Sequence, residues 1–362
     1  MNNNNLINKY FYFVYFVLSI WSPSVSIAQH QPNQPVVHVL MPAYNANGFI
    51  LSSIKSVLEQ NYLNVKLLIF NDGSTDQTFK VVKKLLEDHS LKNKIYIKST
   101  SRNKGVSRTR TTLIQWSKAI EPQAYIFWLD ADDQYTNKFF IRDVIQQMQK
   151  TKADICLVNF SIIYEDEKQK SNSIGLIKEQ EKMTNIIKTI SAIPNQSIQP
   201  MNFLDLLEVT SLGWVKCYAP TVNLPQPIDC PFEDFVYMAA LLEVNVITAL
   251  PTENKSIQYL RRSTSICGKR KSKHFTNDIP DQLTKFFNTV LEHSMYNNEQ
   301  SKKLQMAKNF VLRKLEQYLD ILQKTIKAKS DPDINQNTLK IYRQKAEIIE
   351  NYINEKIDIY KT

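Results

Sequence analysis

The chain has 362 residues, 43% of them hydrophobic and 10% aromatic, so it is long enough for two or three structural units and too apolar to be disordered as a whole. Its formal net charge of +10 suits an anionic partner, although many lysines after Lys269 also fit solvated helix faces. Cys156, Cys217, Cys230 and Cys267 form no C-x-x-C pair, which argues against a zinc site, and Cys217 and Cys230 could pair only in an oxidising compartment.

Residues 1–29 have the pattern of a targeting segment. A polar start with the single basic residue Lys9 precedes an apolar run over 10–21, and Ser26-Ile27-Ala28 fits a signal-peptidase site. The apolar run is about 12 residues long, short of the ~20 that span a bilayer as a helix. We expect a cleaved signal peptide with a periplasmic or secreted product, and keep a membrane-associated signal anchor as the alternative.

From Val36 onward, apolar strands alternate with amphipathic helices, which predicts an α/β fold with a mostly parallel sheet. The expected strands are 36–41, ended by Pro42, then 65–70, 95–97, 125–129 and 155–164. The expected helices cover 49–60, 106–120 and 138–150, and a further helix is expected to begin after a cap at Ser74 or Thr75. Farther on, 165–200 is expected to be irregular, 203–207 and 235–243 helical, 246–262 strand and loop, and the chain from 275 helical.

Four polar clusters follow four of these strands directly: Pro42-Ala43-Tyr44-Asn45, Asn71-Asp72-Gly73-Ser74, Arg102-Asn103-Lys104-Gly105 and Asp130-Ala131-Asp132-Asp133. In open α/β sheets, ligands bind outside the carboxyl ends of the strands, so we expect all four clusters at one rim. Asp72 and Gly73 could instead form an ordinary turn and helix cap. The chain has only six glycines, and two of them lie in these clusters, which favours a binding role.

The acidic turn after the strand 125–129 places three carboxylates within four residues. They need solvent, a basic neighbour or a divalent cation, and a solvated loop is the alternative to a metal site. Hard oxygen ligands suit Mg²⁺ or Mn²⁺. A turn separates Asp130 from Asp132, so only one of them is expected to be a direct ligand. A metal there could bridge a diphosphate and neutralise the charge of a leaving nucleotide.

In this order, the motifs Pro-x-Tyr-Asn, Asn-Asp-Gly-Ser-Thr-Asp, Asn-x-Gly-x-x-x-x-Arg and Asp-Ala-Asp-Asp resemble the family-two glycosyltransferases of the GT-A fold over about residues 37–133. The resemblance implies a Rossmann-like three-layer α/β/α fold with a mostly parallel central sheet and a C-terminal helical region. It also implies inverting, metal-assisted transfer of a hexosyl or N-acetylhexosaminyl group from a nucleotide-diphosphate sugar, with a UDP-sugar favoured. The acceptor would be a hydroxyl of a glycan, lipid or polymer, as in cell-envelope polysaccharide synthesis.

Roles for individual residues follow from the same resemblance. The donor-binding residues would be Pro42, Tyr44, Asn45, Asp72, Gly73, Asn103, Gly105, Arg110 and Asp130, with Asp132 nearest the metal. Two downstream segments, 213–216 and 232–235, resemble acceptor-side segments, with Asp234 as general base and Glu233 as second choice. The alternative for this pair is an acid-rich helix start. Trp214, Lys216, Arg261 and Arg262 would lie on the acceptor or diphosphate side.

The resemblance divides the chain after residue 29 into a donor-binding half over 34–150, an acceptor-side half over 151–266 and a helical region over 267–362. Three departures from the family pattern affect the choice of donor more than the activity. Asn71 stands where an acid is frequent, Arg108-Thr109 replaces small residues, and Gln134 follows the acidic turn.

A competing interpretation is an exported, catalytically inactive glycosyltransferase-like protein that binds a glycan or nucleotide. The targeting segment motivates it, because bacterial nucleotide sugars are made in the cytosol. A nucleotidyltransferase lacks support, since no Gly-rich phosphate loop with a lysine follows the first strand. No nucleic-acid partner is expected, because no recognisable binding module is present. The expected partners are a nucleotide sugar and a glycan or lipid-linked acceptor, with membrane association, while the oligomeric state stays open.

Overall fold

A computed structural model describes residues 34–164, 180–181, 184–188, 190, 217–224, 244, 246–251, 255–261, 277–294, 300–329 and 332–359. Its larger sheet consists of β1 (Val37–Ala43), β2 (Val65–Asp72), β3 (Ile95–Thr100), β4 (Tyr125–Trp128), β6 (Ile155–Leu157), β8 (Cys217–Tyr218) and β9 (Ile247–Ala249). Their order across the sheet is β3-β2-β1-β4-β8-β6-β9. Only β8 runs antiparallel to its neighbours, so the described sheet is mostly parallel, as predicted.

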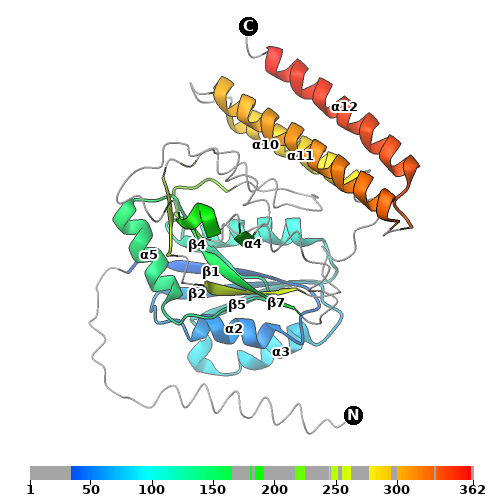
Figure 1. The fold of residues 1–362 in the computed structure, drawn as a ribbon. Helices are drawn as coiled ribbons and strands as arrows, with labels where there is room; N and C mark the ends of the chain where they lie inside the picture. The colour runs from blue at the N-terminus through cyan, green and yellow to red at the C-terminus, as the bar shows by residue number, and fades with distance from the viewer. Residues whose placement is uncertain are drawn as a thin grey trace. The chain divides into compact units, whose positions relative to one another are not determined.

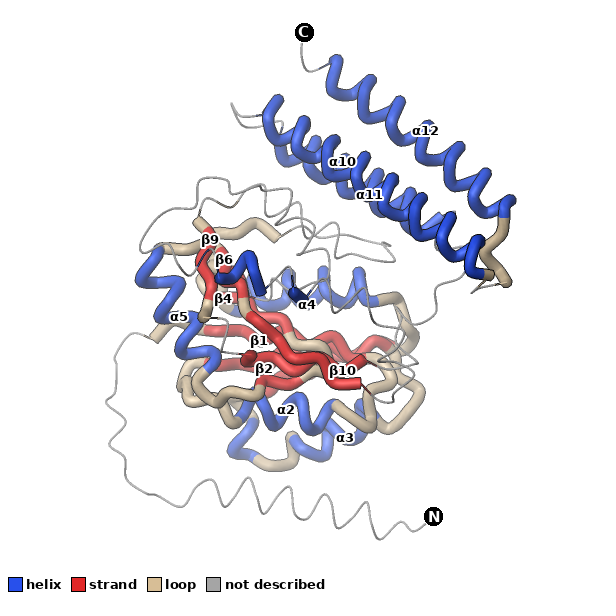
Figure 2. Tube along the Cα trace, viewed as in Figure 1, coloured by secondary structure: helices blue, strands red, loops and turns tan. Residues whose placement is uncertain are grey.

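Helices cover both faces of this sheet (Figures 1 and 2). The helices α2 (Ile50–Leu58) and α3 (Thr78–Leu85) lie on one face, and α4 (Val106–Ile120) lies on the other. Because both faces are covered, the central strand β1 is apolar apart from His38, and Val39, Leu40 and Met41 are fully buried. The three-layer α/β/α architecture is the predicted one.

Strand β1 continues past the residue that was expected to end it. Pro42 lies opposite Phe70 of β2, and the strand runs to Ala43. Proline lacks a backbone N–H and is normally excluded from central strands. Here the pairing of β1 with β4 stops at Leu40, so no β4 partner is paired with the proline. The prediction that Pro42 ends the strand was wrong for this reason.

The single strand expected over 155–164 is two strands in different sheets. Strand β6 belongs to the large sheet, whereas β7 (Asn159–Tyr164) pairs with β10 (Lys255–Arg261). A second, three-stranded sheet has the order β5-β10-β7, with β5 formed by Gln134–Tyr135. The chain therefore changes sheets at Val158, and the apolar pattern on both sides of it gave no local sign of the change.

The predicted cap of α3 was also wrong. The residue that precedes the helix is Gln77, and its side chain makes no cap hydrogen bond. Instead, the Asp76 carboxylate accepts bonds from the backbone N–H and the hydroxyl of Thr78. Burial raises the pKa of Asp76, but hydrogen bonds from Thr78 and from the Asn47 backbone outweigh it, so the pKa lies below its usual value. Ser74 and Thr75 bond across to another loop.

Helix α5 (Phe140–Thr151) belongs to the sheet region. The predicted C-terminal helical region is present as α10 (Ile279–Ser294), α11 (Gln300–Ala328) and α12 (Gln336–Ile359). These three helices pack on one another. The Tyr342 hydroxyl donates to the Leu315 carbonyl at 2.9 Å, and the rings of Phe286 and Phe310 are 4.9 Å apart. None of the helices in the described ranges is long and apolar enough to cross a membrane.

One buried titratable side chain predicts a pH dependence of stability. His38 of β1 is fully buried, its Nδ1 lies 2.8 Å from the Ser117 hydroxyl of α4, and its Nε2 has no hydrogen-bond partner. Burial, followed by the positive charge of Lys66, lowers the pKa of His38 from 6.5 to about 4. The folded state therefore accommodates only the neutral imidazole, and its stability is highest above pH 6.5, where the imidazole is neutral in the unfolded chain as well.

We expect the free energy of unfolding to fall by on the order of 3 kcal/mol as the pH drops from 6.5 to 4. In this range His38 binds a proton in the unfolded chain but stays neutral in the folded chain, so protonation favours unfolding. Denaturant unfolding across this pH range measures the slope. The variant His38→Gln should lose this part of the slope while other groups keep theirs. Identical slopes in the two proteins would show that His38 is not the group responsible.

Candidate functional site

The loops after β1 and β2 are joined to each other by side chains. Asn45 has a φ of 49°, a left-handed conformation that asparagine tolerates better than most residues. Its backbone N–H donates to the Ser74 hydroxyl at 3.0 Å, and its Oδ1 accepts from the Thr75 N–H at 2.9 Å. The Ala46 N–H donates to the Thr78 hydroxyl at 2.8 Å. The two strand ends thus form one connected rim.

Asp72 joins the loop after β2 to the loop after β3. Its side chain is almost fully buried, and its two oxygens accept from the backbone N–H groups of Lys104 and Gly105, each at 2.9 Å. Gly73 lies directly against that loop, because a Cβ placed on it would be 2.3 Å from the carbonyl carbon of Arg102. Asp72 therefore positions the loop that leads into α4, and its predicted contact with a base or ribose stays a prediction.

The acidic turn distributes its carboxylates among different partners. Asp130 forms an ion pair with Arg110 of α4 at 2.9 Å, and this guanidinium lies 5.3 Å from the ring centroid of Trp128. The fully buried Asp133 accepts from the Leu260 N–H of β10 at 3.3 Å. Asp132 is partly exposed. The sequence offered no role for Asp133, because its backbone partner lies 127 positions away in the chain.

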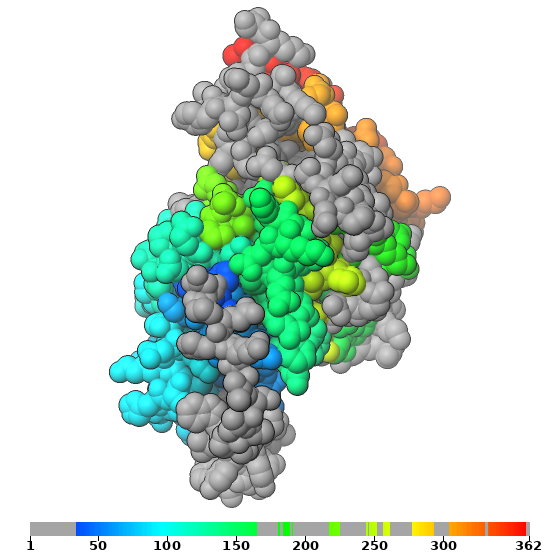
Figure 3. Space-filling model, turned by 90° about the vertical axis from the view of Figure 1, so that its left-hand side faces the viewer, coloured from blue at the N-terminus to red at the C-terminus, as the bar shows by residue number. Residues whose placement is uncertain are grey.

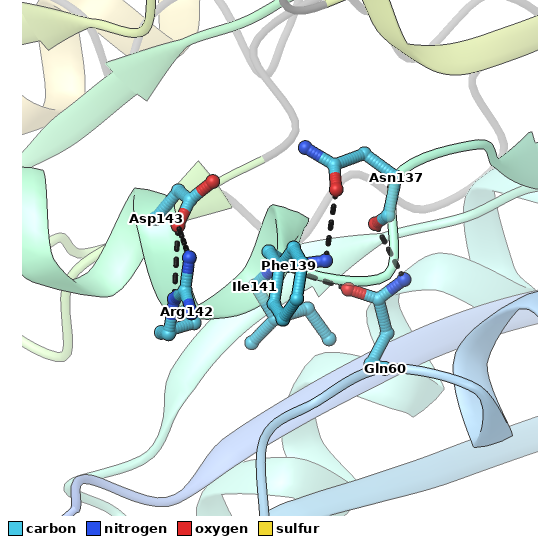
Figure 4. A network of polar contacts seen from close by, with 6 residues as sticks. All are labelled: Gln60, Asn137, Phe139, Ile141, Arg142 and Asp143. Carbon is cyan, nitrogen blue, oxygen red and sulfur yellow. Dashed lines mark hydrogen bonds and ion pairs between the residues drawn. The ribbon is translucent and has the colours of Figure 1, made fainter.

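Side chains in helix α2 and just after it hold the acidic turn and the segment that follows it. The Ser53 hydroxyl donates to the Ala131 carbonyl at 2.9 Å. The Gln60 side chain donates to the Asn137 carbonyl at 2.9 Å and accepts from the Ile141 N–H at 3.1 Å, as Figure 4 shows. Ser53 of α2 thus holds the acidic turn itself, and Gln60, just past the end of α2, holds the segment that follows the turn.

Tyr135 lies behind the same turn and is buried. Burial, with the nearby Cys217 thiol and the carboxylates of Asp133 and Asp130 as further causes, holds its pKa well above the usual value. The phenol therefore stays neutral, and its hydroxyl lies 3.4 Å from the Trp128 carbonyl.

The described carboxylates of the rim do not form a complete metal site on their own. Within the described ranges, no group of three or more His, Cys, Asp or Glu side chains could hold an ion by itself. A partly exposed Asp132 offers one hard oxygen ligand, and Mg²⁺ commonly takes one or two carboxylates and completes its shell with substrate phosphates and water. The residues therefore fit a metal that binds together with a diphosphate.

The described residues bring together the predicted donor-side residues and leave out most of the acceptor-side ones. Tyr44 is 46% exposed on the rim, and the Asn103 side chain accepts from the Gly105 N–H at 2.8 Å. Arg261 ends β10, where it lies opposite Tyr164. Trp214, Lys216, Glu233, Asp234 and Arg262 lie outside the described residues, as does Cys230. Cys217 is buried and lies opposite Cys156 in the sheet.

Comparison with known proteins agrees with the motif order. A model of the family described as "Glycosyl transferase family 2" matches residues 38–203. The chain is 26% identical over 130 residues to the "Processive diacylglycerol beta-glycosyltransferase" of Mycoplasma genitalium, covering 36% of either chain. It is 33% identical over 130 residues to the "UDP-Glc:alpha-D-GlcNAc-diphosphoundecaprenol beta-1,3-glucosyltransferase WfgD" of Escherichia coli, covering 35% of this chain and 47% of that one. The matches therefore span between a third and a half of these relatives.

Solved structures show a similar fold. TarS residues 1–349 of S. aureus, crystallised alone or in complex with UDP-GlcNAc, superpose with a TM-score of 0.54 at 15% identity. The superposition covers 88% of this chain and 90% of TarS 1–349. At this identity the likeness shows the GT-A fold alone, and it confirms the fold predicted from the sequence. The family match confirms the resemblance that the four motifs carry.

Proposed function

We propose that this chain, which matches family two of the glycosyl transferases over residues 38–203, transfers a sugar from a nucleotide diphosphate to an acceptor hydroxyl. The observation that carries the proposal is the rim itself, where Asn45 and Asp72 connect the loops after β1, β2 and β3, and Arg110 of α4 holds the acidic turn after β4. Such an edge is where α/β sheets bind their ligands. The names of the relatives favour a UDP-linked hexose or N-acetylhexosamine as donor.

The donor side of the proposed site is largely set by backbone groups. Asp72 holds the Lys104 and Gly105 amides in place, so the loop needs little rearrangement when a nucleotide binds. Asp132 is the residue proposed to hold Mg²⁺ or Mn²⁺. When bound, the ion supplies positive charge to the diphosphate leaving group. Asp130 pairs with Arg110, and Asp132 is proposed as the ligand because it is partly exposed and matches the second acid of the motif.

The acceptor side rests on the resemblance of the motifs. Inverting transfer needs one carboxylate to take the proton of the acceptor hydroxyl during in-line attack. We propose Asp234 for this role, with Glu233 as second choice, and Trp214, Lys216, Arg261 and Arg262 around the acceptor or the diphosphate. The proposed acceptor is a glycan or a lipid-linked sugar, and the proposed location of the chain is at or beyond a membrane.

The test is a screen of purified full-length chain with UDP-glucose, UDP-galactose, UDP-GlcNAc and GDP-mannose, with Mn²⁺, with Mg²⁺ and with EDTA. We expect release of the nucleoside diphosphate from at least one UDP-sugar, dependent on the added metal. Binding of a nucleotide or glycan without release from any of these donors would overturn the proposal and favour the inactive binding protein.

A further inference from the structure

One edge of the larger sheet carries a dense group of positively charged side chains. Residues 80–104 contain eight Lys and Arg residues against two acids, Glu87 and Asp88, a net charge of +6. All eight cationic side chains are exposed. We call these exposed cations the basic edge. The following sixty residues, 105–164, carry seven cations against six acids, so the basic edge is not a general property of this region.

The basic edge runs over a helix and the strand that follows it. Helix α3 exposes Lys80, Lys83 and Lys84 at the i, i+3 and i+4 spacing of one helix face, while its opposite face is buried. Strand β3 forms the edge of the seven-stranded sheet and exposes Lys98, with Lys94 just before it. In Figure 3 this segment, light blue to cyan, occupies one edge of the face shown.

The far end of the basic edge reaches the candidate site. Arg102 and Lys104 are exposed in the loop whose backbone Asp72 holds, directly after the edge strand. Between Lys94 and Lys104 lies the six-residue strand β3, which is roughly 20 Å long at the usual rise per residue. The cations therefore cover an extended surface that ends at the proposed donor rim.

Protection of an open sheet edge against aggregation explains part of this charge. Lysines on edge strands discourage pairing with a second chain, which accounts for Lys98. It does not account for the three lysines of α3, because a helix has no open edge to protect. The excess over the rest of the sheet region therefore calls for an anionic partner.

Two lysines of the basic edge cover aromatic rings. The Lys98 ammonium lies 4.4 Å from the ring centroid of Trp116, and the Lys83 ammonium lies 4.8 Å from that of Phe79. A ring covered by a cation is not open to the base stacking by which single-stranded nucleic acids are held. Lysine and tryptophan together are instead typical of the boundary between a bilayer and water.

We propose that the basic edge binds the surface of a membrane that contains anionic lipids. The cations lie on helix α3, on the edge strand β3 and on the loop after it, and a membrane with anionic lipids supplies many negative headgroups at one surface. Because the loop of Arg102 and Lys104 belongs both to the basic edge and to the rim, binding would place the candidate site at the lipid surface. This inference goes beyond the proposed function and does not depend on sugar transfer.

The experiment measures binding of the full-length chain to phosphatidylcholine vesicles with and without phosphatidylglycerol, by co-sedimentation. The test variant K80Q/K92Q/K94Q removes three exposed cations of the basic edge whose side chains make no contact described above. The matched control K150Q/K327Q/K340Q removes three exposed cations elsewhere. Residues 1–34 are the same in all proteins, so any binding through them cancels in the comparison. Circular dichroism confirms the fold of each variant.

We expect the anionic lipid to increase binding of the unmodified chain, and added salt to reduce that increase. The test variant should lose about tenfold or more in partition to anionic vesicles, because each lysine near such a surface contributes independently. The control should lose less than about threefold. Equal losses in the two variants would overturn the proposal. So would binding to soluble polyphosphate without any preference for anionic vesicles.

Discussion

Replacement of Asp132 with alanine is expected to reduce sugar transfer by about 10²- to 10³-fold or more while the protein stays folded. The reason is electrostatic, because a metal held next to the diphosphate stabilises the charge that develops on the leaving group. Asp130 cannot replace it, since its carboxylate is paired with Arg110 at 2.9 Å. Asp133 cannot replace it either, because it is fully buried and accepts from the Leu260 N–H.

Steady-state kinetics over a range of Mn²⁺ concentrations measure this effect. Loss of a direct ligand should raise the Mn²⁺ concentration needed for half-maximal activity as well as lower kcat. The matched control is Asp143→Ala, which removes a carboxylate of α5 that pairs with Arg142 at 2.8 Å. It should leave the metal dependence unchanged. Wild-type turnover and metal dependence in the Asp132 variant would show that the metal assignment is wrong.

Replacement of Gly73 with alanine is expected to lower the free energy of unfolding by about 2 to 4 kcal/mol and to weaken nucleotide binding. Its φ of +65° disfavours a side chain, and the added Cβ would meet backbone atoms of Arg102 and Asn103 at 2.3 to 2.6 Å. Backbone cannot rotate away as a side chain can. The loop of residues 102–105 must therefore move, and the hydrogen bonds to Asp72 are lost or lengthened.

Two other glycines separate the clash from the conformational strain. Gly105 has a φ of +92° but open space around the added Cβ, so alanine there should cost about 1 kcal/mol from backbone strain alone. Gly48 has open space and no unfavourable φ, so its alanine variant should change stability by less than about 0.5 kcal/mol. Denaturant unfolding and calorimetric titration with UDP measure both effects. If Gly73→Ala behaved like Gly48→Ala, the close approach of the two loops would be refuted.

The local pattern of residues predicted most of the donor-side fold correctly. The apolar run that became β1 and the helical periodicity over 106–120 are properties of neighbouring residues, and α4 has the predicted bounds. The positions of the four polar clusters could likewise be predicted, because each cluster directly follows an apolar strand in the sequence. Parallel strands bring those ends to one edge, so the rim could be foreseen before any contact was known.

The partners of the rim side chains were decided by the tertiary structure. Asp72 bonds to amides 32 and 33 positions away, and Asp133 bonds to Leu260, 127 positions away. Partners at such sequence separations cannot be read from the pattern of neighbouring residues. The same holds for Pro42, which is tolerated inside β1 because β4 ends its pairing at Leu40.

The acidic turn shows the division between the two sources of information most clearly. Its sequence determined that three carboxylates follow a buried strand and that a basic group, water or a cation must compensate them. Only the fold decided that Arg110 compensates Asp130 and that a backbone amide holds Asp133. The physical reason is that residue type sets the charge to be balanced, whereas packing between distant segments selects the group that balances it.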